Sequence, residues 1–247
     1  MPIFNDDDAA SFKTNGSGFQ FSGIKPTSLG ASEYTIVTIL VDVSSSVAPF
    51  AKDLEETIKS TIKSCQDSPR RDNLLLRVVK FNSHIEELHG FRPLMDCQVD
   101  KYDNVLRPGG TTHLYDASVN VIDALATYGK KLVDEEYDVN GLVVIITDGE
   151  DYTSTLTRKS VKEALGRAMS TEAMESLVSI LIGINVQDPR IGAYLQSFKD
   201  EADIREYVEA ADATPKTLAK VANFVSKSIS SQSQSLKSGQ ASQPINF

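Results

Sequence analysis

Apolar runs of strand length alternate with longer amphipathic stretches along most of this chain of 247 residues, and this alternation limits the folds open to it. The first run, residues 34–41, is rich in Ile, Val, Thr and Leu, which is typical of a strand buried on both faces. In residues 48–64, apolar side chains recur every four positions, which predicts an amphipathic helix. Parallel strands need crossover connections and cover on both faces. The sequence therefore predicts a doubly wound α/β fold, similar to a Rossmann fold.

The remaining elements follow the same alternation. Further strands are expected at residues 74–81, 85–88, 141–147, 177–184 and 204–208. Further helices are expected at residues 114–128, 156–169 and 189–198, and from Pro215 onwards. Because the polar connection 82–84 has the length of a hairpin turn, the strand at 85–88 should be antiparallel and lie at the edge of the sheet. We expect a mostly parallel sheet of about six strands, with one antiparallel edge strand and helices on both faces.

Composition divides the chain into a domain with a tail at each end. Residues 1–32 are rich in Asp, Ser, Gly and Asn and are interpreted as an N-terminal arm. Residues 33–228 form the predicted domain, and residues 229–247 are a Ser/Gln-rich C-terminal tail for which we expect disorder or docking on a partner. Isolated aromatic side chains in the arm could pack either on the domain or on a partner. These are Phe12, Phe19 and Phe21.

The charge of the chain and its cysteine content exclude several functions. The net charge is −9, from 25 basic and 34 acidic residues, so the averaged field repels phosphate backbones and anionic lipid surfaces. Neither nucleic acid nor a membrane is therefore an expected partner. Cys65 and Cys97 lack the spacing of zinc ligands and are expected to be free thiols. Without a secretory signal pattern or a long apolar run, the expected location is the cytoplasm.

Oxygen-bearing side chains follow three of the predicted elements of the sheet. Asp42, Ser44 and Ser46 come directly after the first strand, with a spacing that can direct alternate side chains towards one point. Thr112 follows a pair of glycines just before a helix, and Asp148 follows the very apolar strand at 141–147. In open α/β sheets, ligands bind outside the carboxyl ends of the strands. Hydroxyl and carboxylate oxygens are the ligands that hard divalent cations prefer, so a metal site is predicted there.

This ordered set of loops resembles the metal-ion-dependent adhesion site (MIDAS) of von Willebrand factor A (vWA) domains. The family pattern is Asp-x-Ser-x-Ser, then a threonine, then an aspartate. Residues 147–151, Thr-Asp-Gly-Glu-Asp, look like those of the bacterial and phage-like cytoplasmic members. The resemblance covers about residues 33–228. It implies that Ser44, Ser46 and Thr112 are hydroxyl ligands, whereas Asp42 and Asp148 act largely through water and hydrogen bonds.

The resemblance also implies a function. The cation would be Mg²⁺, or Mn²⁺ or Ca²⁺, and it would bind an Asp or Glu carboxylate of a protein partner. Neutral hydroxyl ligands leave such an ion under-neutralised, which favours an acidic group from outside. Cytoplasmic members of the family commonly work in multi-protein assemblies, including assemblies with AAA+ ATPases, so a comparable partner is implied. The expected activity is binding rather than catalysis.

Three alternatives stay open beside this hypothesis. A metal-dependent hydrolase or phosphotransferase could use Asp42, Asp148, Glu150 and Asp151, with Ser44 as a nucleophile, although His113 is the one histidine near the predicted site. A vWA scaffold with an empty metal site is the second alternative. The third, a nucleotide-binding enzyme, lacks the expected glycine fingerprints. The other two histidines, His84 and His89, are expected at the surface.

Overall fold

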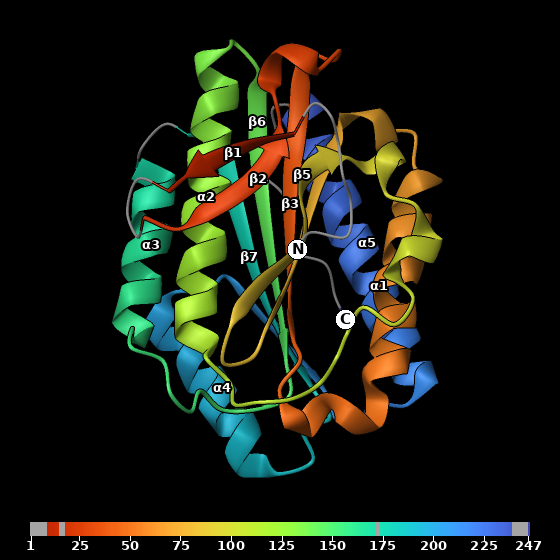
Figure 1. The fold of residues 1–247 in the computed structure, drawn as a ribbon, viewed down its shortest axis with the longest axis vertical. Helices are drawn as coiled ribbons and strands as arrows, with labels where there is room; N and C mark the ends of the chain where they lie inside the picture. Colours follow the sequence, from red (N-terminus) through yellow and green to blue (C-terminus); the bar gives the residue numbers. More distant parts are fainter. Residues whose placement is uncertain (1–8, 15–17, 171–172, 239–246) are drawn as a thin grey trace.

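The computed structural model describes residues 9–14, 18–170, 173–238 and 247 (Figure 1). Its strands form one sheet in the order β1-β2-β5-β4-β3-β6-β7-β8. The strands are β1 (Ala9–Lys13), β2 (Gln20–Ile24), β3 (Glu33–Asp42), β4 (Leu74–Phe81), β5 (Ile85–Pro93), β6 (Asp138–Thr147), β7 (Ser176–Ile184) and β8 (Glu206–Ala210). The prediction of a mixed α/β fold with a mostly parallel sheet is confirmed. The predicted count of about six strands is too low, since the sheet has eight.

The five central strands β4, β3, β6, β7 and β8 are parallel to one another. Their register places Asp42 opposite Phe81 of β4, and Val41 opposite Ile146 of β6. Thr147, the last residue of β6, lies opposite Gly183 of β7. The carboxyl ends of β3, β4 and β6 therefore meet at one edge of the sheet. The loops that follow these strands emerge close together.

Helices cover both faces of the sheet, so the molecule has three layers (Figure 1). On one face lie α2 (Leu114–Asp134), α3 (Arg158–Ser170) and α4 (Pro189–Ala202). On the other lie α1 (Ala51–Gln66) and α5 (Pro215–Ser238). Short 3-10 helices precede or connect these elements: η1 (Pro26–Ser28), η2 (Ser45–Phe50), η3 (Arg71–Asn73), η4 (Leu94–Asp96) and η5 (Val99–Tyr102).

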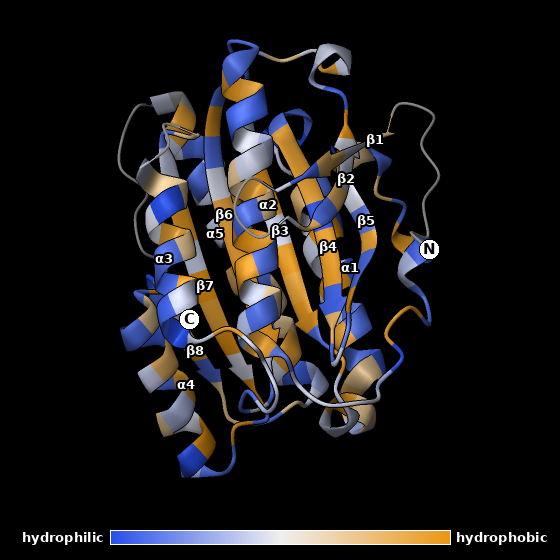
Figure 2. Ribbon diagram, turned by 60° about the vertical axis from the view of Figure 1, so that its left-hand side comes forward, coloured by the Kyte–Doolittle hydropathy of each residue, from blue (hydrophilic) through white to orange (hydrophobic). Residues whose placement is uncertain are grey.

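Each face of the sheet has its own apolar core. Successive side chains of a strand point to opposite faces, so Leu40 belongs to the core under α2 and Val41 to the core under α1 and α5. The same division separates Ile145 from Ile146. The mainly apolar colour of the central strands in Figure 2 follows from this two-sided burial. Two buried faces hold the central strands, and with them the loops at their carboxyl ends, in fixed positions.

The N-terminal region departs from the predicted arm. Strands β1 and β2 pair as an antiparallel hairpin, and β2 pairs with β5 through Gly23 and Phe91. Phe21 is 2% exposed, and the Phe12 ring stacks on it with ring centroids 5.4 Å apart. The Phe12 and Phe21 side chains thus pack on the domain, which is one of the two alternatives that the sequence left open for the aromatic residues of the arm. Strand β5 is antiparallel to β4, as predicted, but it is not the edge because the hairpin lies beyond it.

The C-terminal helix continues into the segment predicted as a tail. Helix α5 extends to Ser238, and within it Ile229 and Gln232 are buried. The side-chain amide of Gln232 donates to the carbonyl of Gly141, at 3.2 Å, and to the Ser176 hydroxyl, at 2.7 Å. Small serine side chains let the helix approach the sheet closely, although their polarity conceals the helix in the sequence. The rest of the predicted tail, residues 239–246, lies outside the described residues.

One histidine also differs from its prediction. His89 is fully buried in β5, where its ring nitrogens lie 2.8 Å from the carbonyl of Gly90 and 2.6 Å from the Tyr102 hydroxyl. Burial lowers the pKa of His89 to about 3, so the ring is neutral and structural. His84 is exposed, as predicted.

Two further sequence predictions can be compared with the structure. Cys65 and Cys97 are both buried and form no disulfide, in agreement with the prediction of free thiols. Burial raises the pKa of the Cys65 thiol to about 12, which keeps it protonated and unreactive. Within the described ranges, no helix combines the length and apolarity that crossing a bilayer requires.

Candidate metal centre

Asp42 organises the first loop of the predicted site. It is the last residue of β3 and is only 1% exposed. Its Oδ1 atom accepts a hydrogen bond from the backbone amide of Ser44, at 2.7 Å, and its Oδ2 atom accepts one from the Thr147 hydroxyl, also at 2.7 Å. Both carboxylate oxygens are therefore held by the protein. This suits a residue that orients the loop and binds a cation through water rather than directly.

Three further predicted residues lie in a continuous chain of oxygen atoms. The hydroxyl oxygens of Ser44 and Ser46 are 3.0 Å apart, and the Ser46 hydroxyl donates to Oδ1 of Asp148 at 2.9 Å. Neighbouring ligand oxygens of an octahedral Mg²⁺ ion, with bonds of about 2.0–2.1 Å, are separated by about 2.9 Å. The same spacing suits ordinary hydrogen bonds. The two separations are therefore compatible both with hydrogen bonds and with oxygens gathered around one cation.

Thr112 lies in a loop that is tied to both neighbouring loops. The backbone amide of Ser45 donates to the carbonyl of Gly110 at 3.2 Å, and the amide of Tyr152 donates to the carbonyl of Thr112 at 2.9 Å. Thr112 is 8% exposed, and its hydroxyl has no hydrogen-bond partner in the part of the chain that the structure describes. Backbone contacts thus bring the loop that carries Thr112 between the other two loops.

Of the two glycines before Thr112, Gly110 is the one whose backbone conformation requires glycine. Gly110 has a φ of +76°, a conformation that side chains other than glycine rarely adopt. The amide of Gly109 donates to the carbonyl of Val43 at 2.8 Å, and its carbonyl accepts from the side chain of Asn82 at 2.6 Å. The sequence predicted a close backbone approach here. The structure identifies the β3 loop and the end of β4 as what the glycines approach.

The electrostatics of the site favour a cation. Within the described residues, neither Asp42 nor Asp148 has a basic side chain as an ion-pair partner. Burial raises the pKa of Asp42, and burial together with the charge of Asp42 raises the pKa of Asp148 to about 6. Two desolvated carboxylates close together oppose each other's ionisation. A divalent cation would remove this repulsion.

These raised pKa values predict how the metal-free protein responds to pH. Folded Asp148 keeps its proton up to about pH 6, whereas the unfolded side chain loses it near 3.8. Protonation of Asp148 therefore stabilises the folded state fully below pH 3.8, the pKa of the unfolded side chain. This contribution to the free energy of unfolding, at most about 3 kcal/mol, is lost as the pH rises through about 6. Urea unfolding in chelator should show this loss. Asp148→Asn should flatten the profile, and identical profiles for the two proteins would contradict the assignment.

The other acidic residues near the site have structural roles. Asp151 accepts hydrogen bonds from the backbone amide of Tyr115, at 3.2 Å, and from Ser154. Asp116 accepts from the amide of Leu156 at 2.7 Å. Glu150 is exposed. Asp151 and Asp116 hold the loop after β6 against the start of α2.

Two residues at the site were not predicted from the sequence. Thr147 holds Asp42, and Tyr152 ties the loop after β6 to Thr112 through its backbone amide. The sequence signals for Thr147 were its place at the end of an apolar strand and in the run 147–151, Thr-Asp-Gly-Glu-Asp, although no role was predicted for it. Tyr152 had none, because its contribution comes from the main chain.

The chemistry of the donors distinguishes between classes of metal. Over the described ranges of the chain, no group of three or more His, Cys, Asp or Glu side chains is placed to hold a metal ion. The predicted centre instead combines three hydroxyls with two carboxylates, an all-oxygen set. Such donors suit Mg²⁺, Mn²⁺ or Ca²⁺, whereas structural zinc sites use Cys and His.

Comparison with known proteins finds solved structures with a similar fold. No family model matches the chain, and no curated protein matches its sequence. Among solved structures, it is similar to the PilB minor pilin from Streptococcus sanguinis, in its D319A mutant, with a TM-score of 0.56, 14% identity and coverage of 86% of this chain and 65% of the pilin. It is also similar to proximal thread matrix protein 1 (PTMP1) from the mussel byssus, with a TM-score of 0.58, 15% identity and coverage of 80% and 48%.

A third similar structure is the pilus adhesin SpaC from Lactobacillus rhamnosus GG in its open conformation, with a TM-score of 0.56, 14% identity and coverage of 92% of this chain and 35% of the adhesin. One structure of PTMP1 is described as having a zinc-occupied MIDAS motif, with a TM-score of 0.55 and 16% identity. This chain spans less than two thirds of the length of each of these proteins. At such identities the likeness concerns the fold alone: most of this chain shares the α/β architecture found in these two pilus proteins and the byssus matrix protein.

Proposed function

We propose that this protein is a metal-dependent protein-interaction module that captures an acidic residue of a partner. The observation that carries the proposal is the convergence of three loops, in which the oxygens of Ser44, Ser46 and Asp148 follow one another at 3.0 and 2.9 Å. Ser44, Ser46 and Thr112 would supply hydroxyl ligands. Asp42 and Asp148 would act mainly through bound water. A cation held in this way offers positive charge to a carboxylate from outside.

The surroundings of the centre support binding to a protein surface. Tyr152 is 78% exposed, and its backbone amide is bonded to the carbonyl of Thr112. Exposed tyrosines are common anchors of protein interfaces because they bury a large area at low entropic cost. An incoming chain whose carboxylate reached the centre would approach the loop that carries this ring. The partner would then gain apolar contact as well as a charged contact.

Metal binding is tested by comparing two neighbouring threonines. Thr112→Ala should weaken Mg²⁺ binding about tenfold or more, because it removes a hydroxyl proposed as a ligand. Thr111→Ala is the matched control, since the exposed Thr111 hydroxyl contacts Thr153 instead. Calorimetric titrations with Mg²⁺, Mn²⁺, Ca²⁺ and Zn²⁺ measure the affinities. Zn²⁺ is included because of the ion described in PTMP1. Equal affinities for both variants and the wild type would refute the ligand assignment.

Partner capture and catalysis are separated by two further measurements. A pull-down from cell extract should retain specific proteins with Mg²⁺ and lose them with chelator, and the Thr112→Ala variant should retain none of these. Incubation of the metal-loaded protein with generic phosphate esters and nucleotides should give no turnover. Turnover that disappears in Asp148→Ala would instead support a hydrolase.

A further inference from the structure

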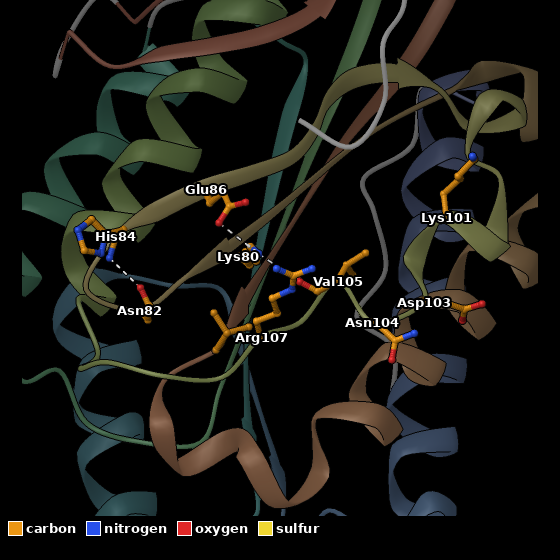
Figure 3. A pocket seen from close by; sticks show the side chains of 10 residues that line it. Lys80, Asn82, His84, Glu86, Lys101, Asp103, Asn104, Val105 and Arg107 are labelled. Carbon is orange, nitrogen blue, oxygen red and sulfur yellow. Dashed lines mark hydrogen bonds and ion pairs between the residues drawn. The ribbon is translucent and has the colours of Figure 1, made fainter. Parts of the chain in front are cut away.

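A polar hollow of about 480 Å³ lies beside the candidate metal centre (Figure 3). Its walls come from the loop after β3, from the β4–β5 hairpin and from the segment that leads to Thr112. Val43, which lies between Asp42 and Ser44 in the chain, lines it. Asn82, which also lines it, donates to the carbonyl of Gly109. The hollow and the metal centre thus share two of their loops.

The basic side chains that line this hollow outnumber the acidic ones. Both of its acidic residues already have basic partners: Glu86 pairs with Lys80 at 3.2 Å, and Asp103 pairs with Lys59 at 2.7 Å. Lys101 and Arg107 also line the hollow and are exposed. Within the described ranges, neither of them forms an ion pair. The hollow therefore has an excess of positive charge in a chain whose net charge is −9.

Arg107 is well placed to act together with the metal centre. Figure 3 shows its side chain extending into the hollow. The segment after Arg107 is fixed to the β3 loop by the hydrogen bond from Gly109 to Val43, at 2.8 Å, and it continues directly to Thr112. A chain that presents one carboxylate to the metal centre can therefore present a second to the Arg107 guanidinium. Arginine suits this role because its planar fork binds carboxylates with two parallel hydrogen bonds.

We infer that this hollow is a second acidic-residue subsite, so that the preferred partner is an acidic segment with two carboxylate side chains a few residues apart. One carboxylate reaches the metal centre, as in the proposed function on which this inference rests. The other lies in the hollow at the Arg107 guanidinium, and Lys101 adds positive charge to the lining. The first contact provides metal-dependent capture. The second selects acidic segments over isolated acidic residues.

The test uses synthetic peptides as probes, labelled for fluorescence anisotropy. One series contains a single Asp among glycines, and the other contains two Asp residues separated by glycine spacers of varied length. With Mg²⁺ present, the best two-acid peptide should bind the wild type about three- to tenfold more tightly than the one-acid peptide. Raised salt should reduce this advantage, because the second contact is partly exposed.

Two double variants test whether the tighter binding of the two-acid peptide depends on the hollow. Arg107→Gln/Lys101→Gln should abolish it while leaving one-acid binding unchanged. Arg71→Gln/Lys63→Gln is the control, since it removes the same charges from exposed positions before β4 and at the end of α1, at the opposite end of the sheet. No two-acid advantage in the wild type, an advantage that survives in the first variant, or an equal loss for both peptides would overturn the inference. Binding that chelator leaves unchanged would instead refute the proposed metal-dependent function.

Discussion

Asp42→Asn is expected to weaken Mg²⁺ binding about 10- to 100-fold, the range typical of residues that orient metal ligands. Asp42 accepts hydrogen bonds from the amide of Ser44 and from Thr147, so its carboxylate fixes the loops after β3 and β6 together. Asparagine keeps the shape but removes one negative charge and one acceptor. The metal-free protein should be as stable as the wild type or more so, because a buried charge without a cationic partner is removed. Calorimetric titration and urea unfolding measure the two effects.

The matched control for this substitution is Asp72→Asn. It makes the same change of charge at an exposed position before β4, at the opposite end of the sheet. Its Mg²⁺ affinity should equal that of the wild type. If both variants lost affinity equally, the effect would come from net charge rather than from the position of Asp42.

Glu87→Ala is expected to lower the free energy of unfolding by about 3–5 kcal/mol, because it leaves a buried arginine without its counter-charge. The Arg77 side chain is 2% exposed, and its Nε atom lies 2.6 Å from Oε1 of Glu87. Glu87 also accepts hydrogen bonds from the amide and hydroxyl of Ser22, at 3.0 and 2.9 Å. One carboxylate thus links β4, β5 and β2. Urea unfolding followed by circular dichroism measures the loss.

The neighbouring residue in the chain provides the control. Glu86 pairs with Lys80, but its side chain is 49% exposed, so Glu86→Ala should cost only about 0–1 kcal/mol. A similar loss of unfolding free energy in the two variants would show that burial is not the reason why the Arg77–Glu87 pair stabilises the fold.

The centre of the fold was predictable because its signal is local. Strands β3, β4, β6 and β7 are buried on both faces, so their apolar runs are visible without knowledge of their neighbours. The loops that follow β3 and β6 carry Asp42, Ser44, Ser46 and Asp148, and the structure brings these together. That they bind a metal stays a prediction.

The parts that the sequence did not reveal depend on contacts between distant segments. Strands β1 and β2 are only five residues each, with polar residues between their apolar ones, and Phe21 in the core and the bond from Ser22 to Glu87 hold them in the sheet. The burial of His89 depends on Tyr102, from a segment with no strand or helix pattern. The last turns of α5 are rich in serine, and Gln232 is held there by groups on β6 and β7.

The hairpin of β1 and β2 covers one side of β5, so a shortened protein that lacks the hairpin would behave differently. A chain beginning at residue 33, the domain boundary that composition favours, would lack both strands and leave the outer side of β5 without its neighbour. Unpaired backbone groups of β5 would then face solvent beside Phe91, which is 1% exposed in the intact fold. Such an open strand edge is a template for pairing with another molecule, so the shortened protein would tend to aggregate.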